Sequence, residues 1–260
     1  MRINFFEEYA TDDNLAKLAL VSWPASVFIA SPSLTEFAAR NQTYERQYPH
    51  ITFGWWPTLP KSYWLSGLAD PQETRALLNA LIVWPHERML PVLLDLELPS
   101  KPPLYLTNSR HIRANKRLLA NFLASAPEHN LQVYTAEYPA PNAFMSAIIS
   151  ALGISPSFSL PHTKLPMCYS SMMRHYFGER VWRWMRRFET RFIQAHPERV
   201  GLALGVTATG VLGNEPLLSA QDLAADLEWA AQSGAREVCI FRLGGVNESY
   251  VAVIQQYATE

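Results

Sequence analysis

Residues 90–138 decide the fold, because two apolar segments there flank an amphipathic one. They read LPVLLDLE (90–97), SRHIRANKRLLANFLASA (109–126) and LQVYTAEY (131–138). Short runs rich in Val and Leu are typical of strands that are covered on both faces. The middle segment has its apolar residues at helical spacing, as in a helix packed on a sheet. These segments therefore predict a β-α-β unit with parallel strands.

The same alternation continues in both directions along the chain. The predicted strands are 3–9, 26–30, 51–56, 90–97, 131–138, 166–170, 200–207 and 237–243. The predicted helices are 11–21, 33–48, 70–82, 109–126, 142–152, 174–196, 219–233 and 248–257. Eight strand–helix pairs in 260 residues match a (β/α)8 TIM-type barrel of the α/β class. We expect residues 1–260 to form a single barrel domain; an open, doubly wound sheet is the alternative.

The amino-acid composition excludes some classes of protein and indicates a folded one. A hydrophobic fraction of 48% excludes an intrinsically disordered chain. A net charge of -1 gives no electrostatic reason to expect nucleic acid or an anionic membrane as a partner. Neither a transmembrane segment nor a signal peptide is recognisable, so we expect a cytoplasmic protein. Cys168 and Cys239 lie in strand-like runs and should be buried free thiols. The oligomeric state stays open.

Asp95 and Glu97 are the sharpest candidates for chemistry. They end the fourth predicted strand, and residues two apart on a strand face the same way. In such barrels the active site lies at the carboxyl ends of the strands. Two neighbouring buried acids repel each other, so one should have a raised pKa and act as a proton donor while the other stays ionised. The alternative is that Asp95 caps a loop or pairs with an arginine, and Glu97 is merely exposed.

Aromatic residues follow the third strand. Trp55 and Trp56 end it, and Tyr63 and Trp64 lie in the next loop. Flat rings at a barrel mouth suit stacking on sugar rings, so we expect Trp55 and Trp56 to form a sugar platform. Ordinary core packing is the alternative for each of them.

Five further residues near strand ends are candidates for substrate binding. Glu8 and Glu137 would each place an acid at the barrel top if their strand faces point inward. Tyr138 and Tyr169 would position a substrate or fill the rim. Arg242 would bind an acidic substrate group, or form an internal salt bridge to Asp95 or Glu8.

Metal and nucleophile motifs are missing from the sequence. The seven histidines are scattered, with no H-x-x-x-H or H-E-x-x-H spacing. G-x-S-x-G is absent as well. We therefore expect neither a metal nor another cofactor.

The segment PVLLDLE (91–97) resembles the fourth strand of glycoside hydrolase barrels that end it in D-x-E, namely chitinase-like and muramidase-like enzymes. The resemblance implies that Glu97 is the general acid and that Asp95 supports it or a substrate-derived intermediate. Tyr134 and Thr135 on the next strand are also similar to the muramidase pattern.

The sequence departs from these patterns elsewhere. Leu93 and Arg242 stand where chitinase-like barrels carry a further acid and a tryptophan, and Glu8 stands where muramidases carry an aspartate. The seventh strand has no glutamate, so a second acid from that side would have to be Glu215, in the following loop.

The leading hypothesis is a hydrolase that cleaves glycosidic bonds of an oligosaccharide or other small substrate by carboxylate acid/base chemistry. One alternative is a metal-independent lyase or isomerase that holds a small acidic substrate on Arg242. The other is a non-catalytic barrel that binds a sugar or a protein.

Overall fold

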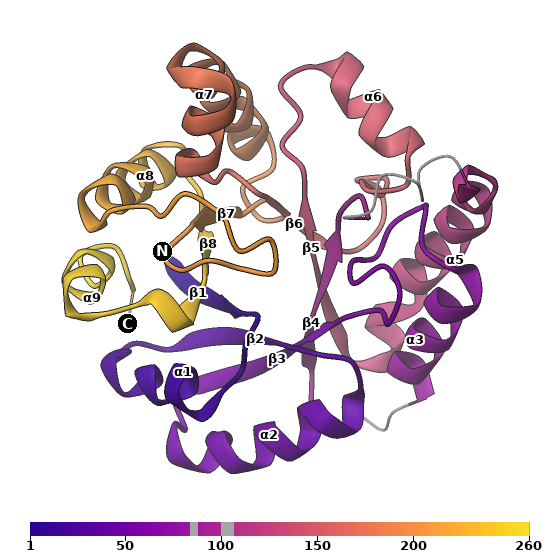
Figure 1. Cartoon of the computed structure of the whole chain (residues 1–260), viewed down its shortest axis with the longest axis horizontal. Helices are drawn as coiled ribbons and strands as arrows, with labels where there is room; N and C mark the ends of the chain where they lie inside the picture. Colours follow the sequence, from indigo (N-terminus) through magenta and orange to yellow (C-terminus); the bar gives the residue numbers. More distant parts are fainter. Residues whose placement is uncertain (84–87, 100–106, 260) are drawn as a thin grey trace.

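A ring of parallel strands lies inside a shell of helices in the computed structural model, which describes residues 1–83, 88–99 and 107–259 (Figure 1). The hydrogen-bonded strand order is β6-β5-β4-β3-β2-β1-β8-β7. Isolated parallel bridges from Lys164 to Val200 and from Met167 to Ala203 join the two ends of this sheet, so the barrel is nearly closed. The predicted (β/α)8 fold is confirmed.

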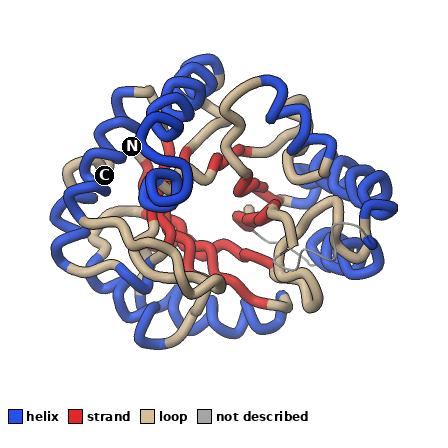
Figure 2. Tube along the Cα trace, turned by 45° about the horizontal axis from the view of Figure 1, so that its top comes forward, coloured by secondary structure: helices blue, strands red, loops and turns tan. Residues whose placement is uncertain are grey.

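Eight strands and eight α-helices alternate along the part of the chain that the structure describes. The strands are β1 (Arg2–Glu7), β2 (Ala25–Ser31), β3 (Ile51–Pro57), β4 (Leu90–Leu96), β5 (Leu131–Glu137), β6 (Thr163–Pro166), β7 (Leu202–Gly205) and β8 (Glu237–Phe241). The α-helices are α1 (Asp12–Ala16), α2 (Leu34–Gln47), α3 (Pro71–Val83), α5 (Ile112–Ser125), α6 (Ala143–Ala151), α7 (Ser170–Ala195), α8 (Ala220–Gln232) and α9 (Glu248–Ile254). Both views show the helices outside and the strands inside (Figure 2).

Polar side chains cap several of these helices where the sequence indicates a start. The Ser33 hydroxyl accepts a hydrogen bond from the Glu36 amide, and Asn142 accepts one from the Met145 amide. Each cap satisfies a backbone N–H that has no partner within the helix. The chain ends lie close together (Figure 1), and the Met1 ammonium donates to the Tyr257 carbonyl at 3.1 Å.

The sixth strand–helix unit differs from the prediction. The strand spans Thr163–Pro166 instead of 166–170, and α7 begins at Ser170 instead of residue 174. Lys164 obscures the strand in the sequence because its charged side chain is buried, where it donates to Glu137 at 2.9 Å. Gly178, with a φ of 80°, interrupts α7 with a conformation that other residues rarely adopt.

Strand alternation divides the core into two parts. Phe6, Phe28, Trp56 and Phe241 belong to an inner cluster that fills the barrel. Leu94 and other residues of the opposite strand faces pack in the layer between strands and helices. The two cysteines are buried and free, as expected. In the described ranges, no helix is long and apolar enough to cross a membrane.

Candidate active site

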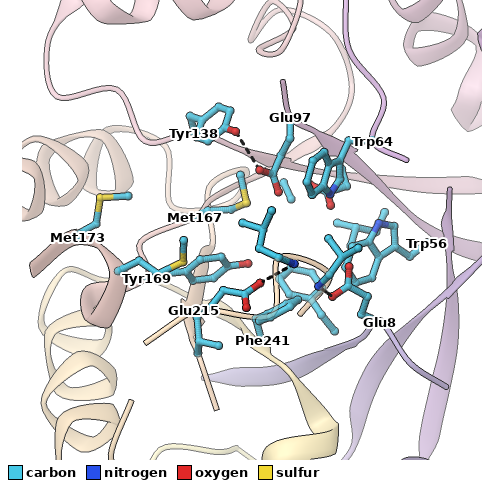
Figure 3. Close-up of a pocket in the computed structure, with 18 residues that line it drawn as sticks. Glu8, Trp56, Trp64, Glu97, Tyr138, Met167, Tyr169, Met173, Glu215 and Phe241 are labelled. Carbon is cyan, nitrogen blue, oxygen red and sulfur yellow. Dashed lines mark hydrogen bonds between the residues drawn. The ribbon is translucent and has the colours of Figure 1, made fainter. Parts of the chain in front are cut away.

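A pocket opens above the inner cluster, at the carboxyl ends of the strands (Figure 3). Strands β1, β3, β4, β5 and β8 contribute to it, together with the segments that follow β1 and β3 to β7. Its floor is apolar, with Phe6, Leu93 and Phe241 among its residues. The acidic side chains that line it are Glu8, Asp95, Glu97 and Glu215.

Alternation along β4 brings Asp95 and Glu97 into this pocket behind Leu93. The backbone there is held by a second segment. The Leu65 amide donates to the Asp95 carbonyl at 3.0 Å, and the Glu97 amide donates to the Leu65 carbonyl at 3.1 Å. The end of β4 is therefore paired on both sides, which fixes the backbone that carries Asp95 and Glu97.

Burial and mutual repulsion shape the protonation of this acid pair. Burial raises the pKa of Glu97 to about 7, although a hydrogen bond from Tyr138 works against the rise. Burial, followed by the charges of Glu97 and Glu8, raises the pKa of Asp95 well above its ordinary value. One Asp95 oxygen is buried without a hydrogen-bond partner. The pair therefore retains at least one proton at neutral pH.

Tyr138 and Tyr169 reach the pocket from the ends of β5 and β6. The Tyr138 hydroxyl donates to Glu97 Oε2 at 3.0 Å, and this bond is drawn in Figure 3. Tyr169 packs on Phe241, with ring centroids 5.6 Å apart, and lines the same pocket. Burial is the main cause that raises the pKa of Tyr169 well above its ordinary value, so its hydroxyl stays protonated and can donate a hydrogen bond.

Glu8 lies across the pocket from Glu97. Its Oε1 accepts from the Tyr63 hydroxyl at 2.8 Å, and its Oε2 accepts from the Val211 amide at 2.9 Å. Burial raises the pKa of Glu8, opposed first by the hydrogen bond from Tyr63. Glu8 therefore fixes both the loop after β3 and the loop after β7.

Trp55 does not line the pocket, so the prediction that it forms a sugar platform with Trp56 is wrong for Trp55. The Trp55 ring stacks on Phe37 of α2, and its indole N–H donates to the Ser31 carbonyl at 3.2 Å. Consecutive strand residues face opposite ways, so only Trp56 points inward. Trp64 lines the pocket beside it.

Glu137 also lies outside the pocket, because the inward face of β5 carries Tyr134, Ala136 and Tyr138 instead. Glu137 points toward the helices, where it accepts from Lys164 at 2.9 Å and from the Thr135 hydroxyl at 2.6 Å. The prediction that its strand face points inward is wrong.

Arg242 is bound to protein groups instead of facing the pocket. Its guanidinium donates to Glu7 Oε1 at 2.8 Å and to the Thr209 carbonyl at 2.9 Å, and it lies 4.7 Å from the Tyr9 ring centroid. The alternative prediction for Arg242, an internal salt bridge, is confirmed, but the partner is Glu7 and not Asp95 or Glu8.

Two pocket residues come from loops that carry little sequence signal. Glu215 follows β7 by ten residues and is buried in the pocket wall. Trp64 is placed by the pairing of its neighbour Leu65 with Leu96. Among the described residues, no group of three or more His, Cys, Asp and Glu side chains is arranged to hold a metal ion.

No protein-family model and no curated protein matches the sequence. Solved structures do match in fold. A chitinase from Chromobacterium violaceum aligns with a TM-score of 0.64 and 10% identity over 98% of each chain. A GH18 chitinase from Cycas revoluta, in complex with allosamidin, gives 0.65 and 10% over 99% of each chain. The spore cortex-lytic enzyme SleL of Bacillus megaterium gives 0.65 and 10%, over 99% of this chain and 74% of that one. The chain thus shares the barrel fold of these proteins.

Proposed function

We propose that the protein hydrolyses glycosidic bonds of an oligosaccharide, with Glu97 as general acid and Asp95 as its partner. One observation carries this proposal. Two adjacent carboxyl groups share a buried pocket whose described lining includes no lysine, arginine or histidine. No ion pair stabilises them there, so their burial costs folding free energy. A role in chemistry explains why the protein keeps this unfavourable arrangement.

The protonation of Glu97 suits the first step of the reaction. With a pKa of about 7, a substantial fraction of Glu97 is protonated at neutral pH and can give its proton to the glycosidic oxygen. The bond from C1 to that oxygen then breaks, and the leaving alcohol keeps the proton. Asp95, whose raised pKa keeps it protonated, donates a hydrogen bond to Glu97 and stabilises the Glu97 carboxylate that this step leaves. Water then attacks C1 and gives a proton back to Glu97, which completes hydrolysis. Tyr138 orients Glu97 through its hydrogen bond.

The aromatic side chains support a sugar as the substrate. Trp56 and Trp64 line the pocket with Tyr169 and Phe241, which gives apolar surfaces next to carboxylate and hydroxyl acceptors. The similar solved structures add weight, since two are described as chitinases and one is bound to allosamidin. Their low identity leaves the choice of glycan open.

The alternative with a small acidic substrate has less support. It needs Arg242 as the anion-binding residue, but Arg242 is engaged with Glu7 outside the pocket. The acidic lining would also repel an anion. The test below also distinguishes the other alternative, a non-catalytic barrel that binds sugar without cleaving it. That the whole chain acts as one domain in the cytoplasm stays a prediction.

The test is hydrolysis of a glycan panel by the wild type, Glu97→Gln and Asp95→Asn. Glu128→Gln is the matched control, because it makes the same chemical change at an exposed site away from the pocket. Glu97→Gln should lower kcat/KM by about 10²–10⁴-fold, the usual contribution of a general acid. The control should keep wild-type activity. An active wild type with an equally active Glu97→Gln variant would remove the proton-donor role. A wild type that binds glycans without cleaving them would leave the non-catalytic barrel.

A further inference from the structure

The pocket holds more carboxyl groups than the proposed reaction uses. Asp95 and Glu97 carry the chemistry, but Glu8 and Glu215 are in the same pocket wall. No cationic side chain stands among the described residues of that lining. The two extra carboxyl groups therefore need an explanation of their own.

Glu8 and Glu215 come together at Gly210, although they are far apart in the sequence. A Cβ atom added at Gly210 would lie 2.5 Å from Glu8 Oε2 and 3.0 Å from Glu215 Oε1. Those two oxygens accept hydrogen bonds from the next amides of the loop, Val211 to Glu8 and Leu212 to Glu215. Glycine at 210 is thus what allows two carboxylates to flank one point of the backbone.

The second oxygen of Glu215 has no such partner. Glu215 is 8% exposed, and its Oε2 is buried without a hydrogen bond. In Figure 3 its carboxyl group points into the pocket beside Phe241 and Tyr169. A buried carboxylate oxygen with no donor is unfavourable by itself, so holding the loop does not account for the whole side chain. Its free oxygen indicates a donor that arrives with the ligand.

We propose that Glu215, assisted by Glu8, binds the ammonium group of an unacetylated amino sugar, so that the glycan substrate carries free amines. This inference rests on the proposed function for its glycan class. An ammonium group has three N–H donors and a full positive charge, which match the free oxygen and the excess of carboxylates. The apolar surroundings of the pocket strengthen that attraction. Glycans bearing carboxylates would be repelled for the same reason.

Binding measurements separate this inference from the catalytic one. We would titrate the tetramer of β-1,4-linked glucosamine and its fully N-acetylated counterpart into Glu97→Gln protein by calorimetry. The same titrations would follow in that background with Glu215→Gln or with the control Glu128→Gln. The free-amine tetramer should bind about tenfold more tightly than the acetylated one, as expected for one charge-assisted hydrogen bond. Glu215→Gln should abolish that preference by weakening only the free-amine tetramer, and the control should keep it.

Three results would overturn the inference: equal affinity for both tetramers, no binding of the free-amine tetramer, or an equal loss for both in Glu215→Gln. The last would indicate that Glu215 only holds the loop or the pocket shape. If Glu215→Gln does not fold, the ratio of the two tetramer affinities for Glu97→Gln protein still tests the preference for free amines. Glu8→Gln in the same background is then the second variant, and it should reduce that ratio. A wild type that binds the free-amine tetramer selectively but cleaves no glycan would contradict the proposed function and leave the amine site standing.

Discussion

Glu137 and Glu97 end neighbouring strands of the barrel, yet they lie on opposite faces with opposite surroundings. Glu137 faces the helices and accepts hydrogen bonds from Lys164 and Thr135. Glu97 faces the pocket, where the charges that act on it are those of other carboxylates, Glu8 and Glu215. Both acids end apolar strands, so burial alone does not mark a site of chemistry. The presence or absence of a cationic partner separates the two.

Glu7 and Glu8, at the end of β1, repeat this contrast. Glu7 is paired with Arg242 at 2.8 Å, behind the strand. Glu8 lies in the pocket and is held by the Tyr63 hydroxyl and the Val211 amide. The same strand end thus supplies one structural ion pair and one pocket carboxylate.

The largest expected effect comes from breaking the pair on the helix side. Lys164→Met leaves Glu137 buried without its cation, which should lower the free energy of unfolding by about 3–5 kcal/mol. Urea denaturation measures the change. Adding Glu137→Gln to Lys164→Met should restore part of the loss, because the uncompensated charge is then gone. A loss below about 1 kcal/mol would show that the pair contributes little to stability.

Glu97→Gln should have the opposite effect on stability, and it should depend on pH. Because the folded-state pKa of Glu97 is raised from 4.5 to about 7, its favourable contribution is complete below about pH 4.5 and is lost as the pH rises through about 7. Glutamine lacks this loss. The variant should therefore be more stable than the wild type at pH 8 by on the order of 2–3 kcal/mol, with little difference at pH 4.

Chemical denaturation at both pH values tests this, with Glu128→Gln as the control. A stability difference that stays constant with pH would mean that Glu97 titrates normally in the folded protein.

Tyr138→Phe should have the smallest effect of the three, a shift in the pKa of Glu97. The Tyr138 hydroxyl stabilises the ionised form of Glu97, so its removal should raise the pKa of Glu97 further. The alkaline limb of the pH–activity profile should move up by about one pH unit, the value of one hydrogen bond to a charged group. Tyr134→Phe, four residues earlier on the same face of β5, should leave the limb unchanged. A downward shift in Tyr138→Phe would contradict the role assigned to the hydroxyl.

Much of this arrangement follows from the sequence, because it depends on local periodicity. The β-α alternation predicts the barrel, and the two-residue spacing of Asp95 and Glu97 predicts that they share a face. The same rule says that Trp55 and Trp56 point apart, but it does not say which of them points inward. For Glu137 that choice was predicted wrongly, since the register of β5 relative to its neighbours decides it.

The sequence names Trp64 and Glu215 but does not place them in the pocket, because their positions depend on contacts between distant segments. Trp64 enters through the pairing of Leu65 with Leu96, and Glu215 through a loop held by Glu8. The sixth strand was misplaced because Lys164 has the character of a surface residue. It is buried only because Glu137 and Ser155 receive its ammonium group.

The titration of the Glu97 carboxyl group is the most direct measurement of the contrast between the two faces. Glutamate labelled with ¹³C at the side-chain carboxyl carbon allows this by NMR, and the Glu97→Gln spectrum identifies the resonance. A pKa of about 7 is the predicted result. A pKa near the ordinary glutamate value of about 4.3 would contradict a pocket that keeps Glu97 protonated for catalysis.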